Sequence, residues 1–235
     1  MPETTRSARA DDAEDADVAH ITASRREARR RQRQELSRAQ LLDAAEDLFG
    51  RKGFHDATLR EVAELAEFSV GSVYSFFESK DDLFRQVLAR RGDEFMAPMR
   101  ALLAPPGAGR RAADPAASDP VAQLRALVDH QVGFFRTHPS FGRLFLRHAN
   151  LDLLASGVVD PAIVDNLAEA MALQADLFRR GQEAGRLRAG DPAVLARLFS
   201  GLVAAFQALD VEAAAADDHP DPATLHAVIA GAFVI

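Results

Sequence analysis

The chain has 235 residues, 48% of them apolar, and it contains no cysteine. This length suits one ordinary domain or two small ones, and the missing cysteines exclude a disulfide framework, a thiolate zinc site and a cysteine nucleophile. The net charge of −7 argues against contact between a polyanion and the chain as a whole.

The charge is unevenly distributed along the chain. Residues 1–20 carry two basic and six acidic residues, and residues 92–235 carry twelve basic and seventeen acidic residues. Residues 21–91 carry fourteen basic residues against twelve acidic ones. Only this middle segment is positive, so contacts with phosphates are expected there.

The N-terminal residues are predicted to lack a packed structure. Residues 1–23 are polar and acidic and show no periodicity, which predicts disorder. Seven arginines follow between Arg25 and Arg38, with Glu27 and Glu35 as the only acidic residues among them. Residues 1–33 are therefore expected to be a disordered tail and a basic arm. The arm is either a contact to nucleic-acid phosphates or the minor groove, or a solvated run of charge, and its place before the next helices favours contact.

The first compact helix is predicted to follow the arm. Ser37 and Gln40 have the spacing of a capping box, so the helix is expected to begin there. Gly53 is expected to end it in a left-handed conformation. Its core face has helical periodicity and consists of Leu41, Leu42, Ala45, Leu48 and Phe49.

Two further helices are predicted, joined by a short turn. Thr58 and Glu61 form another capping box, so one helix is expected to begin at Leu59. Ser69 is expected to cap the next helix, in which Val73 and Phe77 are four residues apart and point to the core.

The outward side of this last helix carries small, hydroxyl or aromatic side chains, namely Val70, Ser72, Tyr74 and Ser75. Gly71 has no side chain, so the helix can approach another surface closely. Such a helix suits the major groove of DNA. In a purely structural interpretation, Gly71 costs ~1 kcal/mol relative to alanine without a compensating gain.

A longer set of residues at fixed spacing covers residues 37–83. It consists of Leu41, Leu42, Ala44, Ala45, Leu48, Phe49, Gly53, Phe54, Thr58, Val62, Ala63, Ala66, Ser69, Gly71, Ser72, Val73, Tyr74, Phe77, Ser79, Lys80, Asp82 and Leu83. This set resembles the DNA-binding domain of the tetracycline-repressor (TetR) family of bacterial transcription regulators. Glu67 is a departure, because the family usually has glycine in this turn, where a positive φ is often needed.

The resemblance implies roles for individual residues. Thr58, Tyr74 and Lys80 lie at positions that usually contact phosphates, although the Tyr74 ring could also cover the core. Residues 70, 72 and 75 lie near base edges, and residue 76 lies near the DNA backbone. The predicted DNA-binding set is Arg30, Arg31, Arg33, Arg38, Thr58, Ser69, Val70, Gly71, Ser72, Tyr74, Ser75, Phe76 and Lys80.

The remaining chain is predicted to be helical. One helix is expected from Lys80 to Leu103, followed by a loop over residues 105–119 that is rich in proline, glycine and alanine. Four Asp-Pro pairs predict helix starts near residues 120, 161, 192 and 222, and His138-Pro139 precedes a helix over residues 140–155. The fold is therefore predicted to be all-α with about nine helices, which matches the TetR plan. The expected domains are a helix-turn-helix DNA-binding domain at 34–83 and a ligand-binding and dimerisation domain at 84–235.

The last two predicted helices are too apolar for a fully exposed surface. In the TetR family these helices form a four-helix interface with a second subunit, although they could instead close the core of the monomer. The predicted interface residues are Leu198, Leu202, Phe206, Val228 and Phe233.

Bulky apolar residues in the C-terminal region predict a pocket for an apolar or amphipathic effector. An ordinary helical core has a similar composition. The predicted lining is Phe134, Phe135, Phe145, His148, Met171, Gln174, Phe178 and Phe206.

The predicted function is a homodimeric transcription regulator that binds a palindromic operator in double-stranded DNA and is released by a small effector. A helix-turn-helix regulator without an effector is the alternative. An all-α enzyme is disfavoured, because the G-x-S-x-G, H-E-x-x-H, P-loop and G-x-G-x-x-G motifs are missing. His130, His138 and His148 lack carboxylate support at metal-site spacing, so neither a metal nor a cofactor is expected. Without a run of ~20 apolar residues or a secretory signal, a cytoplasmic protein with no membrane partner is expected.

Overall fold

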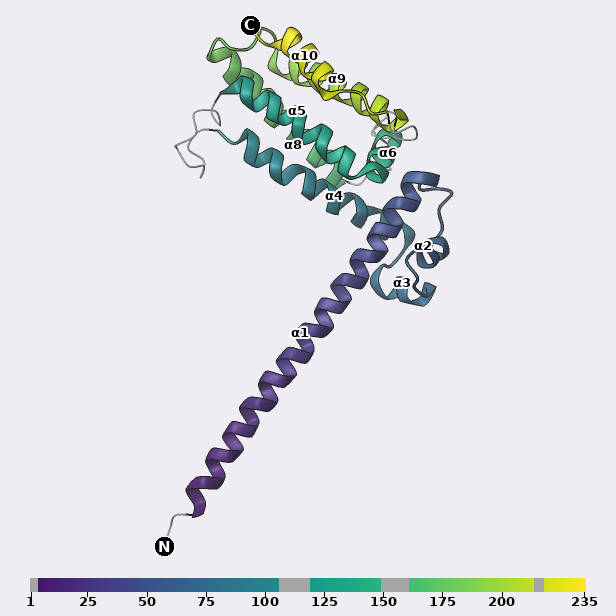
Figure 1. Cartoon of the computed structure of the whole chain (residues 1–235), viewed down its shortest axis with the longest axis vertical. Helices are drawn as coiled ribbons and strands as arrows, with labels where there is room; N and C mark the ends of the chain where they lie inside the picture. Colours follow the sequence, from purple (N-terminus) through teal and green to yellow (C-terminus); the bar gives the residue numbers. More distant parts are fainter. Residues whose placement is uncertain (1–3, 106–118, 149–160, 214–217) are drawn as a thin grey trace.

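The computed structural model describes residues 4–105, 119–148, 161–213 and 218–235. These described residues form nine helices, so the fold is all-α as predicted (Figure 1). The helices are α1 Thr4–Lys52, α2 Leu59–Leu65, α3 Val70–Phe76, α4 Lys80–Leu103, α5 Pro120–Thr137, α6 Pro139–His148, α8 Pro161–Glu183, α9 Pro192–Ala213 and α10 Pro222–Phe233.

Side-chain caps start most of these helices where the sequence predicted them. The hydroxyls of Thr58, Ser69 and Ser79 accept hydrogen bonds from backbone N–H groups in the first turns of α2, α3 and α4. Asp119 and Asp221 cap α5 and α10, each with a proline in the first helical turn. Each cap satisfies an N–H group that the helix leaves unpaired, which is why these short motifs identify helix starts.

Two predictions fall partly outside the described residues. The helix expected to reach residue 155 corresponds to α6, whose described part ends at His148. Asp160, the predicted cap of α8, also lies outside the described residues.

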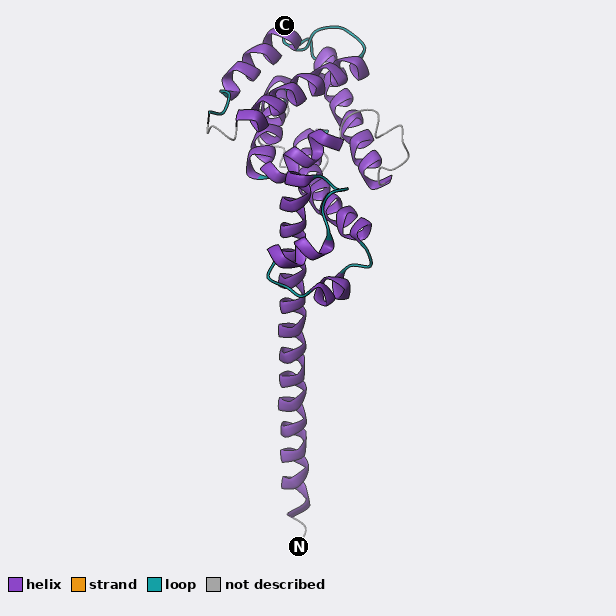
Figure 2. Ribbon diagram, turned by 90° about the vertical axis from the view of Figure 1, so that its right-hand side faces the viewer, coloured by secondary structure: helices purple, strands orange, loops and turns teal. Residues whose placement is uncertain are grey.

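The start of α1 differs from the prediction. The helix begins at Thr4, so the predicted disordered tail is helical and Ser37 lies inside the helix rather than at its N-cap. No proline or glycine interrupts residues 4–49, where alanine and arginine are frequent. These residues favour the helix and let it continue past the capping box. The N-terminal part of α1 projects as a long rod away from the other helices (Figures 1 and 2).

Two apolar clusters hold the helices together. The first joins α1, α2, α3 and the start of α4, and Phe49, Val73 and Phe77 at its centre are at most 1% exposed. The second joins the end of α4 with α5, α8, α9 and α10. Leu83 of α4 belongs to the first cluster and Met99 to the second, so one helix connects the two clusters.

Helix α6 follows α5 in the chain but packs on the N-terminal cluster. Phe141 and Leu144 of α6 and Phe135 of α5 are members of the first cluster. A Cβ atom at Gly50 would lie 2.4 Å from the carbonyl oxygen of Ser140, so glycine is required where α1 meets the first turn of α6. The N-terminal and C-terminal helices are therefore in direct contact in addition to their link through α4.

Helix α9 has the length and composition of a membrane-spanning helix, which the sequence analysis did not anticipate. In the structure, Ala196, Phe199 and Val203 of α9 lie in the second cluster. The core helix of a bundle has the same composition, so this feature by itself does not indicate a membrane span.

Candidate nucleic-acid interface

The turn between α2 and α3 accommodates Glu67 without changing its type. The N–H of Phe68 donates to the carbonyl oxygen of Ala63 at 2.8 Å, and the N–H of Glu67 donates to that of Glu64 at 3.2 Å. These two bonds define a Schellman motif. Glu67 occupies its left-handed position with a φ of 61°. The turn predicted for glycine is thus retained, with the strain confined to one exposed residue.

Helix α3 is held by one face and leaves the other face free. Val73 is fully buried, whereas Tyr74 is 58% exposed and Val70 is 37% exposed. Ser75 is exposed on the same free side. Phe76 is half-buried against the first cluster, so part of this predicted contact residue holds the helix in place.

The serines of α3 already bond within the helix. Ser69 Oγ accepts the N–H of Ser72 at 3.1 Å and lies 2.8 Å from Ser72 Oγ. Ser75 Oγ donates to the carbonyl oxygen of Ser72 at 2.6 Å. With its proton used in this bond, Ser75 presents lone pairs as hydrogen-bond acceptors.

Gly71 has no packing reason to be glycine. A Cβ atom there would meet only Ser69 Oγ, at 3.9 Å. The residue is exposed and is the second residue of α3, and glycine has a low helix propensity. The described chain therefore leaves room for a side chain at this position.

The seven arginines between Arg25 and Arg38 of α1 divide into two groups. Five of them recur at spacings of three and four residues, which places them on one side of the helix, and all are exposed. This arginine stripe consists of Arg25, Arg26, Arg29, Arg30 and Arg33.

The other two predicted arginines have partners within the chain. Arg31 forms an ion pair with Glu27 at 3.1 Å. Arg38 donates to Gln86 of α4, and its guanidinium lies 5.9 Å from the centre of the Phe77 ring. Arg38 therefore joins α1 to α4. The arginine stripe also includes Arg25, Arg26 and Arg29. The predicted DNA-binding set omitted these three residues, although their spacing was visible in the sequence.

A capping box with an added lysine holds the start of α2. The Thr58 hydroxyl accepts the N–H of Glu61 at 3.3 Å, and the Glu61 carboxylate accepts the N–H of Thr58 at 3.0 Å. Lys52 also donates to this carboxylate. The hydrogen bonds from Lys52 and Thr58 lower the pKa of Glu61 from 4.5 to about 2. The carboxylate therefore stays ionised and keeps its bonds at neutral pH.

Lys80 is placed differently from the sequence expectation. Its Nζ donates to the carbonyl oxygens of Phe54, His55 and Ala57 at 2.9, 3.2 and 3.0 Å. The same atom lies 4.5 Å from the centre of the Phe54 ring. The ammonium group thus faces the connection between α1 and α2 rather than presenting a free charge for a phosphate.

Residues 41–87 match a family model described as bacterial regulatory proteins of the tetR family. The match covers α2, α3 and the parts of α1 and α4 that pack on them. Residues 41–87 of this chain are therefore of the tetR type.

Proteins described as HTH-type transcriptional regulators share parts of this sequence. The chain is 41% identical to YfiR of Bacillus subtilis over 56 residues, which are 24% of this chain and 27% of YfiR. It is 28% identical to RutR of Escherichia coli over 127 residues, 54% of this chain and 51% of RutR. The chain thus spans about a quarter to a half of the length of these curated relatives.

Solved structures share the fold over most of the chain. The fatty acid degradation regulator FadR of Bacillus halodurans superposes with a TM-score of 0.63 over 83% of this chain and 95% of FadR, at 19% identity. A TetR-like regulator from Rhodococcus gives a TM-score of 0.61 over 82% of this chain and 91% of its own, at 22% identity. At these identities the likeness concerns the fold alone.

The TetR fold leaves an apolar face exposed on its last two helices. Leu198 is 56% exposed and Val228 is 47% exposed, and Leu202 is half-buried, so these predicted interface residues can meet a partner. Phe206 and Phe233 cannot, because they lie in the second cluster of their own chain at 7% and 3% exposure. The sequence prediction missed two further exposed residues of α9, Val194 and Leu209.

The predicted effector residues are divided between the two clusters. Phe135 is buried in the first cluster, with Phe134 and Phe145 packed against it. Phe178 and Phe206 are buried in the second. The predicted lining residues therefore belong to two different apolar clusters. The His148 side chain lies outside the described part of the chain.

Polar groups inside the C-terminal bundle were largely missed by the sequence analysis. The predicted residue Gln174 is 2% exposed and accepts the hydroxyl of Ser200 at 2.7 Å, beside Met171. Gln131 of α5 and Gln207 of α9 are 7% and 4% exposed, and their amide nitrogens lack a hydrogen-bond partner among the described residues. Isolated glutamines in apolar helices carry no distinctive sequence signal, so burial alone identifies them.

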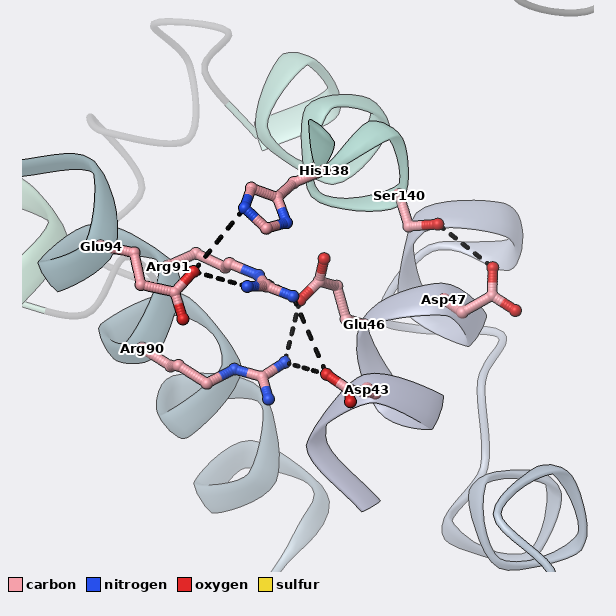
Figure 3. A network of polar contacts seen from close by, with 8 residues as sticks. All are labelled: Asp43, Glu46, Asp47, Arg90, Arg91, Glu94, His138 and Ser140. Carbon is pink, nitrogen blue, oxygen red and sulfur yellow. Dashed lines mark hydrogen bonds and ion pairs between the residues drawn. The ribbon is translucent and has the colours of Figure 1, made fainter. Parts of the chain in front are cut away.

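A network of charged residues joins α1, α4 and the α5–α6 turn (Figure 3). Glu46 of α1 is 4% exposed and accepts Arg91 Nε at 2.7 Å and Arg90 Nη2 at 3.1 Å. Burial lowers the pKa of Arg91, but its bonds to Glu46 and Glu94 outweigh burial and raise that pKa. Burial, followed by the nearby Arg91, lowers the pKa of His138, so its imidazole is neutral at neutral pH.

A polar crevice of about 330 Å³ lies at this network. It is unlike the predicted phenylalanine-lined pocket, because its walls include Asp43, Glu46, Asp47, Arg91, His138 and Ser140. Of the three histidines considered for a metal site, His130 has its Nε2 atom 2.9 Å from the carbonyl oxygen of Phe95.

Proposed function

We propose that this chain is a dimeric, sequence-specific DNA-binding regulator that represses transcription until a small effector releases it. The observation that carries the proposal is the free face of α3, mounted on a three-helix unit that matches the TetR family model. An exposed helix with small side chains fits the major groove.

The chemistry of the free face supports base contact by α3. The outward lone pairs of Ser75 suit the amino groups of adenine and cytosine, which are the donors in the major groove. Val70 provides an apolar contact of the kind made with the methyl group of thymine. Tyr74 of α3 and Thr58 at the start of α2 are exposed as well and supply hydroxyls for phosphates.

The arginine stripe supports a second contact with DNA outside the reach of α3. Its five guanidinium groups lie on one side of a helix that is continuous with the DNA-binding unit. A helix about 10 Å wide is too broad for a minor groove of about 6 Å. The stripe therefore contacts phosphates on the flanks of the operator instead of entering the minor groove as a flexible arm would.

The exposed apolar face of α9 and α10 supports dimerisation. Val194, Leu198 and Leu209 recur along α9 and are each more than half exposed. Burying such a face against a second copy removes apolar area from water. Two-fold symmetry then presents two α3 helices to one side, so the operator is expected to be a palindrome.

The unpartnered amides of Gln131 and Gln207 support an effector site within the bundle. A buried donor without an acceptor costs about 1–3 kcal/mol, which a bound molecule can offset. The effector is therefore expected to be largely apolar and to carry hydrogen-bond acceptors such as carbonyl or carboxylate oxygens.

Helix α4 supplies the route from effector to DNA. It belongs to both clusters, and Arg90 and Arg91 bind it to Glu46 of α1. An effector that prefers one tilt of α4 shifts the population of DNA-binding arrangements. A 100-fold loss of operator affinity requires a differential of ~2.7 kcal/mol, which one apolar ligand can supply.

Selection of bound sequences from a random DNA pool tests the proposal. We expect a palindromic consensus whose affinity falls linearly with salt on logarithmic axes. Ser75→Ala should change the preferred base at one position in each half-site. Arg33→Gln should lower the affinity for all DNA sequences by the same factor. A pool without enrichment would contradict specific DNA binding.

A thermal-shift screen of acceptor-bearing apolar molecules tests the effector. Compounds that stabilise the wild type are expected to lose this effect in Gln131→Leu and to release the operator at saturation. Stabilising compounds that leave operator affinity unchanged would favour a regulator without an effector.

A further inference from the structure

We propose that Lys80 is a positioning residue that locks the connection between α1 and α2, residues 53–58, to the first turn of α4. The inference rests on the proposed DNA binding and explains how the DNA-binding unit keeps its shape. It replaces the phosphate contact expected for this lysine from the family resemblance.

The geometry saturates the ammonium group. A lysine has three N–H donors, and Nζ of Lys80 has three carbonyl acceptors, those of Phe54, His55 and Ala57, within 3.2 Å. The Phe54 ring, at 4.5 Å, adds a cation–π contact. To reach a phosphate, Lys80 would have to give up at least one of these bonds.

The position of Lys80 in its helix supports the same conclusion. It is the first residue of α4, where the helix dipole disfavours a positive charge. Asp81 and Asp82, which follow it, are the charges that this end of a helix favours. A lysine at this point therefore needs a compensating partner, and the three converging carbonyl oxygens provide one.

Both lysines of the chain serve the same connection. Lys52, at the end of α1, bonds Glu61 in the capping box that starts α2. Lys80 bonds the carbonyl oxygen of Ala57, the residue directly before the cap Thr58. The start of α2 is thus tied to α1 on one side and to α4 on the other, so a tilt of α4 is passed to α2 and α3.

The salt dependence of DNA binding distinguishes positioning from phosphate contact. Lys80→Met removes the donors and keeps a chain of similar length; we expect operator affinity to fall at least tenfold with the salt slope unchanged. Arg33→Gln, the control for a phosphate contact, should flatten the slope by about 0.9. If the Lys80→Met variant flattened the salt dependence of operator affinity by the same amount, the inference would be overturned.

Reductive methylation of the wild type tests the lysine without DNA and without a variant that could fail to fold. With only two lysines in the chain, mass mapping assigns each modified site directly. We expect Lys80 to react at least tenfold more slowly in the native protein than in the denatured protein, with operator DNA present or absent. Protection that appears only with DNA would overturn positioning, whereas protection in a protein that selects no DNA would refute the proposed function alone.

Discussion

The free faces of α3 and α9 lie on the same chain but differ in chemistry. On α3 the exposed side combines Val70, Gly71, Tyr74 and Ser75, which are small or carry a hydroxyl. On α9 it contains Leu198 and Leu209, both 56% exposed. Hydroxyls and a missing side chain suit the hydrated, charged surface of DNA, whereas leucines suit a second apolar face. The difference teaches that exposure alone does not identify a partner, and that composition must be considered with it.

The strongest test of this contrast separates the two sides of α9. Phe206→Ala in a monomeric Leu198→Glu background should lower the free energy of unfolding by about 3–5 kcal/mol, because the ring fills the core of its own chain. Urea denaturation followed by circular dichroism measures it. If Phe206 belonged to the subunit interface, its truncation in a monomer would have almost no effect.

The apolar face of α9 should carry the dimer. Leu198→Glu places a charge on a face expected to be buried between subunits, so it should give monomers and lower operator affinity about 100-fold, or ~2.7 kcal/mol. Sedimentation velocity and DNA titration measure the two effects. Arg197→Glu is the matched control on the neighbouring exposed position; a similar loss there would indicate general charge repulsion from DNA instead.

Gly71 on the free face of α3 should lower the stability of the fold but let the helix approach DNA closely. Gly71→Ala should stabilise the fold by about 0.5–1 kcal/mol, because its Cβ meets open space, yet weaken operator binding about tenfold. Gly133→Ala on α5, where a Cβ also meets no atom within 4 Å, should stabilise the fold without changing DNA binding. Thermal unfolding measures the stability of both variants, and DNA titration measures their operator affinity. If Gly71→Ala bound the operator as tightly as the wild type, close approach to DNA would not explain the glycine on α3.

The smallest expected change in stability concerns two turns of the same Schellman type. The end of α8 repeats the Schellman motif of Glu67, with Gly185 at a φ of 64° in the left-handed position. Glu67→Gly should raise the free energy of unfolding by about 0.5 kcal/mol, and Gly185→Ala should lower it by about 1 kcal/mol. Chemical denaturation measures both; a destabilising Glu67→Gly would show that the glutamate side chain contributes more than its backbone strain costs.

The N-terminal unit was largely predictable because its signals are local. The capping residues Thr58, Ser69 and Ser79 and the buried pair Val73 and Phe77 act within one or two helical turns, so their spacing is visible in the sequence. Extent was harder. The capping box at Ser37 does not begin α1, since nothing in residues 4–36 interrupts a helix.

The C-terminal site was less predictable because it depends on which side of each helix is covered. The resemblance to the TetR family placed Phe206 and Leu198 together on an expected interface, but packing buries the first and exposes the second. Gln131 and Gln207 gave no sequence signal, since an amide becomes notable only when burial leaves it unpartnered.

By itself, the sequence determined the all-α class, the helix-turn-helix and most helix starts, because caps, prolines and periodicity act through neighbouring residues. Only the tertiary structure decided what each charged or apolar side chain faces. Lys80 illustrates the reason: its three acceptors lie 23–26 residues earlier in the chain, and they converge on its ammonium group only after α1 and α4 have packed together.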